Sequence, residues 1–114
     1  MPNDRVLSGL SLAQKAGQIA SGEFAAERAV KEGRAFLVIV AGDASDNTKK
    51  KIKNMTEYRG IPCYTYADRE NLGRCIGREY RSMAAVTHSG FADSIEKQLR
   101  VISQRNREEE EWQK

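Results

Sequence analysis

The chain has 114 residues, of which 39% are hydrophobic, and this length and composition fit one domain with a single modest core. Its longest apolar run, residues 35–41, is much shorter than the roughly 20 residues of a membrane span, and its N-terminus lacks the continuous apolar stretch of a signal peptide, so we expect a cytoplasmic protein. Residues 1–107 carry 18 basic and 12 acidic side chains, and this balance of +6 either favours an anionic partner or only keeps the surface soluble.

The first part of the chain predicts two helices and two strands. Apolar residues at helical spacing indicate a first helix, with Asn3 or Asp4 as its N-cap. A short strand over residues 18–20 leads to a second helix, for which Ser21 is the expected N-cap. Residues 35–41 are apolar and rich in β-branched side chains, as in a strand that is covered on both faces.

The second part continues the alternation, with strands predicted over residues 61–66 and 82–87. Helix starts are expected at Ser45 or Asp46, at Asp68, and at Ser89 or Gly90. Regular alternation of this kind favours a mixed or largely parallel sheet with helices on both faces, which is a three-layer α-β-α sandwich. We expect one domain over residues 1–104, followed by a charged tail over residues 105–114.

Motifs of the common enzyme classes are absent from the sequence, which has no GxSxG, P-loop, HExxH or GxGxxG. Asp43 follows the clearest strand, where α/β folds often place functional groups, but an acidic residue is also a common turn former and we interpret it as one. Two cysteines without a CxxC spacing and a single histidine predict no metal site. We therefore expect a protein that is not an enzyme and that uses no cofactor.

Three features are candidates for binding an anion. A helix start at Ser21-Gly22 offers unpaired N–H groups and a positive dipole, although a simple helix cap has the same sequence. The lysine-rich run 49–53 is either a phosphate patch or a solvated helix face. Arginine suits phosphate and base contacts, and four arginines gather near the fourth helix and the strand after it: Arg69, Arg74, Arg78 and Arg81.

Several short segments resemble, in their order and spacing, the superfamily of small kink-turn-binding ribosomal proteins, and most of all its bacterial YlxQ-type members. The matching segments are Leu10–Gly17, Ser21-Gly22, Ala29–Ala41, Asp43–Ile52, Ile61-Pro62, Asn71–Gly73, Ile76-Gly77, Ala85–Thr87 and Gly90-Phe91. Together they cover about residues 5–103. The resemblance implies an α/β fold, a three-layer α-β-α sandwich with a mixed four-stranded sheet, and it implies RNA binding without enzymatic activity.

The resemblance also implies where RNA is bound. In the family, a glycine, two polar residues and a basic residue contact the kinked bases, and a second contact loop precedes the last strand. Gly22 and Arg28 match the glycine and the basic position, whereas Phe24 and Ala25 stand where the polar residues belong. Phe24 can stack on a base or pack inward, but neither residue can hydrogen-bond a base edge. The implied RNA-binding residues are Gly22, Glu23, Phe24, Ala25, Arg28, Arg81, Ser82 and Met83.

The sequence supports two alternative hypotheses about function. The first is that of a ribosomal-protein-like protein of the translation apparatus that binds structured, kink-turn-type RNA as a monomer, with ribosomal RNA and translation-associated proteins as further partners. The alternative is a protein-interaction module of the same fold that has lost specific kink-turn recognition. In that case Phe24, Ala25 and Ala26 would form an apolar docking spot at the helix start.

Overall fold

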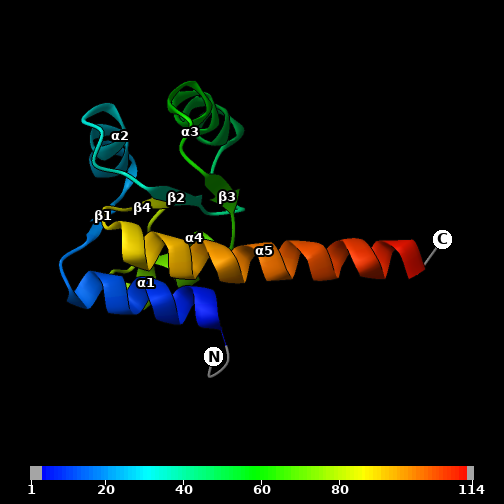
Figure 1. Ribbon diagram of the computed structural model, residues 1–114. Coiled ribbons are helices and arrows are strands. Elements are labelled where there is room, and N and C mark those ends of the chain that lie inside the picture. The colour runs from blue at the N-terminus through cyan, green and yellow to red at the C-terminus, as the bar shows by residue number, and fades with distance from the viewer. Residues whose placement is uncertain (1–3, 113–114) are drawn as a thin grey trace.

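The computed structural model describes residues 4–112, in which helices and strands alternate as the sequence predicts (Figure 1). The elements are α1 (Arg5–Lys15), β1 (Ile19–Ser21), α2 (Glu23–Lys31), β2 (Leu37–Val40), α3 (Asp46–Arg59), β3 (Cys63–Thr65), α4 (Arg69–Cys75), β4 (Met83–Val86) and α5 (Ser89–Trp112). Strands β2, β3 and β4 are shorter than the runs that predict them, because the ends of those runs belong to the connecting loops, whereas β1 is shifted by one residue from the predicted range 18–20.

The four strands form one sheet in the order β1-β4-β2-β3. β4 runs antiparallel to both of its neighbours, with Ser21 opposite Ala84 and Val40 opposite Met83. β2 and β3 run parallel, with Val40 opposite Thr65. The sheet is therefore mixed, as expected. Four residues lie at the same end of its strands, one in each strand: Ser21, Val40, Met83 and Thr65.

Helices cover both faces of this sheet, which confirms the three-layer sandwich. α2 and α3 lie on one face, and α1, α4 and α5 lie on the other (Figure 1). Each face has its own buried cluster, because alternate residues of a strand point to opposite sides. Leu37 and Ile39 of β2 pack toward α1, α4 and α5, whereas Val38 and Val40 pack toward α2 and α3. The central strands β2 and β4 are fully buried, and for β2 the apolar run 35–41 predicts this.

Three of the predicted helix caps are confirmed. The side chains of Asp4, Ser45 and Asp68 each accept a hydrogen bond from a backbone N–H in the first turn of α1, α3 and α4. The last helix begins at Ser89 as expected, but its first-turn amides donate to Nδ1 of His88, at 3.1 Å from Gly90 and 3.4 Å from Phe91.

The prediction that Ser21 caps the second helix is wrong. Ser21 is the last residue of β1, and Gly22 is the N-cap of α2, with no side-chain cap. The Ser21 hydroxyl instead accepts a hydrogen bond from Nε of Arg81 at 3.3 Å. Pairing with β4 therefore holds Ser21 in the sheet and directs its side chain to a residue 60 positions later.

The final helix α5 continues to Trp112, so the expected tail is helical through that residue, and residues 113–114 lie outside the described range. The boundary predicted at residue 104 stays a prediction. Within residues 4–112, no helix has both the length and the apolar character needed to cross a lipid bilayer. Among residues 4–105, whose side chains the structure describes, no cluster of potential metal ligands is found.

Alkaline pH is expected to destabilise the fold through Tyr66. Its hydroxyl donates to Asp4 at 2.9 Å, and burial, aided by this carboxylate, raises the pKa of Tyr66 to about 12. The folded state therefore holds the proton more tightly than the unfolded chain, in which the tyrosine pKa is about 10. The stabilisation is complete below about pH 10 and is lost as the pH rises toward about 12.

Denaturant unfolding of the wild type and of Tyr66→Phe over this pH range measures the effect. Tyr66→Phe should be less stable near neutral pH, where it lacks the bond to Asp4, and its stability should fall less as the pH rises. Tyr58→Phe is the control, because this tyrosine is 85% exposed. Parallel pH profiles for the wild type and Tyr66→Phe would contradict this role.

Candidate functional site

The turn between β1 and α2 meets the loop before β4, which brings the two segments with predicted site residues together. The backbone N–H of Gly22 donates to the carbonyl of Met83 at 2.9 Å, and Ser21 pairs with Ala84 in the sheet. Across this contact lies Arg81, whose side chain is within 3.8 Å of the position that a Cβ on Gly22 would take. We call the surface made by residues 21–25, Arg81 and Ser82 the Gly22 corner.

Gly22 allows the sharp turn at this corner. Its φ of 90° and ψ of 162° lie in a region that is almost restricted to glycine. Space is not the limiting factor, because an added Cβ would lie 3.7 Å from Arg81 Cδ, which is ordinary van der Waals contact. The sequence therefore needs glycine here for its backbone angles, which let the chain pass directly from β1 into α2.

The first turn of α2 presents backbone donors at this corner. The first intrahelical bond runs from Ala26 N–H to the Gly22 carbonyl, so the N–H groups of Glu23, Phe24 and Ala25 precede the helical ladder. No side chain caps them. Because these donors lie at the positive end of the helix dipole, the corner favours an anion such as a phosphate.

Arg81 places a guanidinium group beside these donors. Its Nε donates to Ser21 Oγ at 3.3 Å, its Nη1 donates to the carbonyl of Tyr80 at 2.7 Å, and its backbone N–H donates to the carbonyl of Arg69 at 3.0 Å. The side chain is thus fixed at both ends of the guanidinium fork. A second cation, Arg28, lies further along α2, where it is 63% exposed and pairs with Glu32 at 3.0 Å.

Glu32 serves as the shared anion of this part of the surface. It accepts from Arg28 and, at 2.8 Å, from Arg34, and the two hydrogen bonds hold the pKa of its carboxyl below the usual range. Glu32 therefore stays ionised near neutral pH. A phosphate that binds Arg28 has to compete with this exposed pair, which is a weak competitor because water screens it.

The remaining predicted site residues differ in their accessibility. Phe24 is 80% exposed, so it does not pack inward, and Glu23 is exposed beside it. Ser82 is half-buried, and its carbonyl accepts from Ala41 N–H at 2.7 Å. The side chain of Met83 is fully buried in the core beneath α2 and α3, so only its backbone lies at the corner. The roles of all these residues in binding stay predictions.

A neighbouring contact was not foreseen from the sequence. Asp43 accepts a hydrogen bond from the backbone N–H of Arg69 at 2.8 Å and lies 3.5 Å from its Nε. The backbone hydrogen bond holds the pKa of Asp43 below its ordinary value. Asp43 thus braces the loop after β2 against the start of α4, and the carbonyl of Arg69 in turn holds Arg81. Nothing in the spacing of residues 26 positions apart signals this contact.

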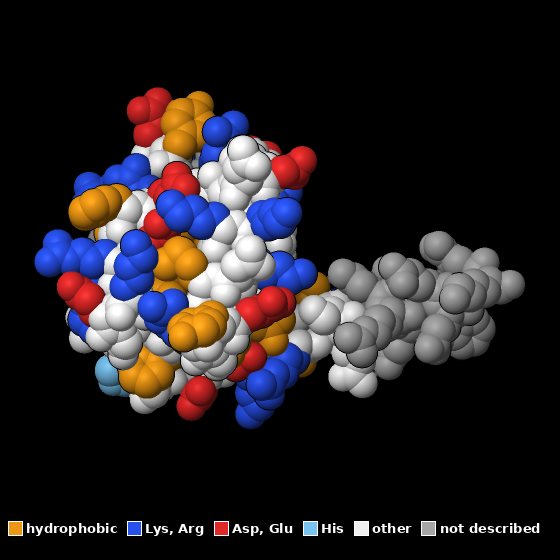
Figure 2. Space-filling view, turned by 90° about the horizontal axis from the view of Figure 1, so that it is seen from above, with side chains coloured by type: hydrophobic (Ala, Val, Ile, Leu, Met, Phe, Trp, Pro, Cys, Tyr) orange, Lys and Arg blue, Asp and Glu red, His pale blue; other side chains and the backbone are white. Residues whose placement is uncertain are grey.

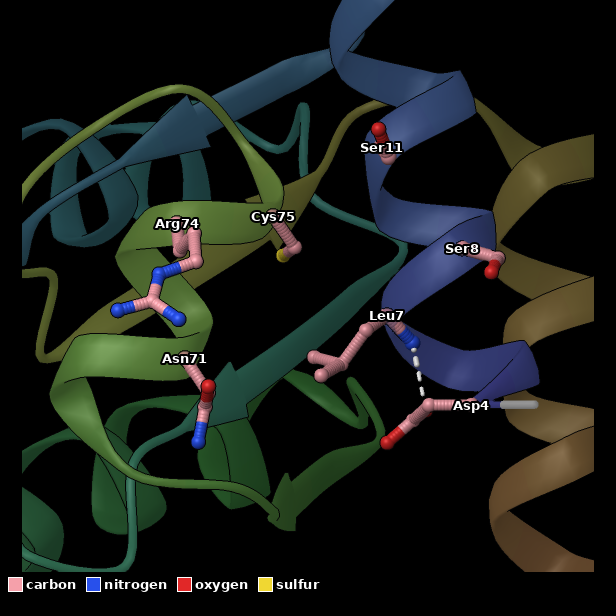
Figure 3. A pocket seen from close by; sticks show the side chains of 7 residues that line it. All are labelled: Asp4, Leu7, Ser8, Ser11, Asn71, Arg74 and Cys75. Atoms are coloured by element: carbon pink, nitrogen blue, oxygen red, sulfur yellow. Dashed lines mark hydrogen bonds between the residues drawn. The ribbon is translucent and has the colours of Figure 1, made fainter. Parts of the chain in front are cut away.

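A separate pocket of about 230 Å³ lies between α1 and α4 (Figure 3). Its two charged side chains are already engaged: Asp4 caps α1 and accepts from Tyr66, and Arg74 pairs with Glu70 at 2.8 Å. Burial raises the pKa of the Cys75 thiol to about 11, so the thiol is not a nucleophile at neutral pH. This pocket does not assemble an acid–base or nucleophilic arrangement.

Positive charge is distributed over the face that carries α2 and α3. Figure 2 views this face and shows Lys and Arg side chains spread across it, with acidic and hydrophobic side chains between them. The lysines of α3 contribute to it, and Lys51 alone among them forms an ion pair in the described part of the chain, with Glu27 at 3.1 Å. The positive surface therefore extends well beyond the Gly22 corner.

Comparison with known proteins places the chain in a family. Residues 4–96 match the model of the Ribosomal protein L7Ae/L30e/S12e/Gadd45 family. The chain belongs to this family. A relative from Bacillus subtilis (strain 168), named RNA-binding protein YlxQ, is 40% identical over 86 residues, which are 75% of this chain and 86% of the relative. A relative of the same name from Enterococcus faecium is 32% identical over 88 residues, which are 77% and 84% of the two chains. The predicted resemblance to YlxQ-type members of the superfamily is confirmed.

Solved structures agree with this membership. A protein of unknown function from Bacillus halodurans C is 35% identical and superposes with a TM-score of 0.79, over 82% of this chain and 94% of that one. The Giardia lamblia 15.5kD RNA binding protein superposes with a TM-score of 0.71 over 82% and 80% of the two chains. At 23% identity, this second likeness supports the fold alone.

Proposed function

We propose that this member of the family is a non-enzymatic RNA-binding protein that holds structured, kink-turn-type RNA at the Gly22 corner. The observation that carries the proposal is that three uncapped N–H groups at the start of α2 lie beside the guanidinium of Arg81, which comes from the loop before β4. The family membership and the names of the relatives support it.

RNA phosphates supply the anion that this corner favours. Amide donors and arginines bind the sugar-phosphate backbone, and such contacts position a nucleic acid without reading its sequence. Phe24 is exposed next to these donors and offers a face on which an unstacked base can stack. Phe24 and Ala25 supply no side-chain hydrogen bond to a sheared G·A pair, so affinity here rests on phosphate contacts and stacking.

The proposal also covers the RNA partner, the cellular location and the oligomeric state of the protein. The RNA is one of the translation apparatus, with ribosomal RNA as the first candidate, and the protein acts in the cytoplasm as a monomer. Translation-associated proteins are further partners. The basic surface over α2 and α3 supports a large anionic partner of this kind (Figure 2).

Titration of a labelled kink-turn RNA, with a matched duplex that lacks the G·A pairs, tests the proposal. At about 100 mM salt we expect micromolar or tighter binding to the kink-turn RNA, weaker binding to the duplex, and a steep loss of affinity as salt rises. Equal, weak binding to both would leave only general contact with RNA backbones. Undetectable binding to kink-turn RNA and to ribosomal RNA would contradict the proposal.

Arg28→Ala is expected to weaken this binding by roughly three- to eightfold at about 100 mM salt, which corresponds to the loss of one phosphate contact. Arg28 is exposed and pairs only with Glu32 in the described structure, so the fold should not change. Arg5→Ala is the matched control, because Arg5 is an exposed arginine on α1, in the other helix layer. An equal loss in both variants would show that overall charge, and not this position, sets the affinity.

A protein-interaction module is the second candidate, favoured by the 80% exposure of Phe24. Its docking spot is smaller than the sequence suggests, because Ala26 is fully buried and only Phe24 and the half-buried Ala25 remain accessible. A protein partner recovered after nuclease treatment, and lost with Phe24→Asp, would favour this function. Loss of RNA binding with the same variant and no such partner would favour the first.

A further inference from the structure

A groove of about 430 Å³ lies between α3 and the edge strand β3, apart from the residues of the Gly22 corner. On the α3 side it is lined by Asp46, at the start of the helix, and by the three lysines Lys49, Lys50 and Lys53. On the sheet side it is lined by Val40 of β2 and by Cys63 and Thr65 of β3. Lys53 is a neighbour of both other lysines on the helix surface, because it follows Lys50 by three positions and Lys49 by four. The groove therefore has one cationic wall from α3 and one wall from residues of β3.

The lysines of this groove are available to a ligand. Lys50 and Lys53 are exposed, and in residues 4–105, whose side chains the structure describes, neither they nor Lys49 forms an ion pair. Lys51 differs, because it points to α2 and pairs with Glu27 at 3.1 Å. With Asp46 as its single acid, the lining of the groove carries an excess of positive charge.

The strand wall adds backbone donors. β3 is the outer strand of the sheet, and it pairs with β2 through Pro62 O, which accepts from Val38, and Tyr66 N–H, which donates to Val40. Residues alternate along a parallel strand, so the backbone N–H groups of Cys63 and Thr65 point away from β2. Unpaired backbone groups on an outer strand can bind another molecule. Cys63 and Thr65, which carry these groups, line the groove together with the lysines.

The groove and the Gly22 corner lie at the same end of the strands of the sheet. Val40 pairs with both Met83 and Thr65, and Ser21 pairs with Ala84. From β1 to β3 there are three strand spacings of about 4.8 Å, so roughly 15 Å separates the two places. At about 3.4 Å per nucleotide step along one strand, this distance corresponds to about four or five steps of a duplex. One RNA of modest size can reach both.

We infer that the groove between α3 and β3 is a second RNA-binding site, in which Lys50 and Lys53 contact phosphates of the RNA that the Gly22 corner holds. The inference rests on the proposed function, and it adds to it the path of the RNA across the protein. Three features favour a phosphodiester backbone as the occupant: the excess positive charge, the unpaired N–H groups of β3, and the position of the groove at the same end of the sheet as the Gly22 corner. An acidic protein segment is the competing occupant.

The double variant K50Q/K53Q tests the inference with the kink-turn RNA used above. If each lysine contacts one phosphate, the slope of log Kd against log salt should fall by about 2, and Kd at about 100 mM salt should rise roughly tenfold or more. The control K15Q/K97Q removes the same charge from exposed positions on α1 and α5, in the other helix layer, and should leave the slope unchanged.

The outcomes separate this inference from the proposed function. Wild-type protein that binds no RNA would overturn both. Wild-type protein that binds RNA, with the same affinity and salt slope for K50Q/K53Q, would overturn only the second site. The second site would also be overturned if a polyglutamate peptide bound the wild type and lost its affinity in K50Q/K53Q while RNA binding stayed intact, because the groove would then belong to an acidic protein segment.

Discussion

Gly73→Ala is expected to lower the free energy of unfolding by about 2 kcal/mol, although alanine is the better helix former. Gly73 is buried in α4, and an added Cβ would lie 2.9 Å from both Cα and N of Tyr80 and 3.0 Å from the carbonyl carbon of Glu79. These are backbone atoms, so the overlap cannot be relieved by a side-chain rotation. Overpacking costs up to about 3 kcal/mol, and the gain from helix propensity offsets about 1 kcal/mol of it.

Equilibrium unfolding in denaturant measures this difference. Glu70→Ala is the control in the same helix, because it loses an exposed ion pair with Arg74 and a first-turn acid, and should cost well under the 2 kcal/mol expected for Gly73→Ala, about 0.5–1 kcal/mol. Since the loop that Gly73 contacts also carries Arg81, Gly73→Ala should weaken RNA binding as well. A variant as stable as the wild type would contradict the close packing of α4 against this loop.

Arg81→Ala is expected to raise the Kd for RNA by roughly ten- to hundredfold. The substitution removes a cation whose guanidinium is held between Ser21 and the carbonyl of Tyr80, next to the uncapped start of α2. A charged hydrogen bond in a prepared site contributes about 1.5–3 kcal/mol, and each 1.4 kcal/mol is a tenfold change in Kd. Arg81→Lys should recover only part of the affinity, because it keeps the charge but loses the planar fork.

Binding titrations of both variants with the kink-turn RNA, together with their melting temperatures, check this expectation. Arg74→Ala is the control, since Arg74 is a nearby arginine that is 71% exposed and pairs with Glu70 on the surface of α4. Its RNA affinity should stay close to that of the wild type. If Arg81→Ala binds as tightly as the wild type, the guanidinium does not contact the RNA and the corner loses its main cation.

The order of the elements could be predicted because local signals specify it. Capping side chains at Asp4, Ser45 and Asp68 and the buried run 35–41 each act within a few residues. The local sequence wrongly predicts a cap at Ser21, because the pairing of β1 with β4 and the contact with the distant Arg81 decide its role. The sequence does not predict His88 as a cap, because histidine is not among the residues that commonly cap helices, and its Nδ1 reaches the amides only once the helix has formed.

The candidate site was harder to predict than the fold. Residues 22 and 81–83 were grouped through the family resemblance, since the spacing along the chain does not indicate that β1 pairs with β4. The sequence also does not distinguish Met83, whose side chain is in the core, from Arg81, which faces the corner. Likewise, the lysine run 49–53 reads as a uniform patch, but the fold divides it into one ion-paired lysine and three that line a groove.

Amide chemical shifts, recorded while the kink-turn RNA is added to isotope-labelled protein, test most directly whether RNA binds at the Gly22 corner. We expect the largest changes at Gly22, Glu23, Phe24, Ala25 and Arg81, with little change along α1 and the α1-facing side of α5. Changes at this corner that Arg81→Ala removes would match the proposed site. Saturating RNA that leaves these amides unchanged, or that shifts only residues of the opposite helix layer, would contradict it.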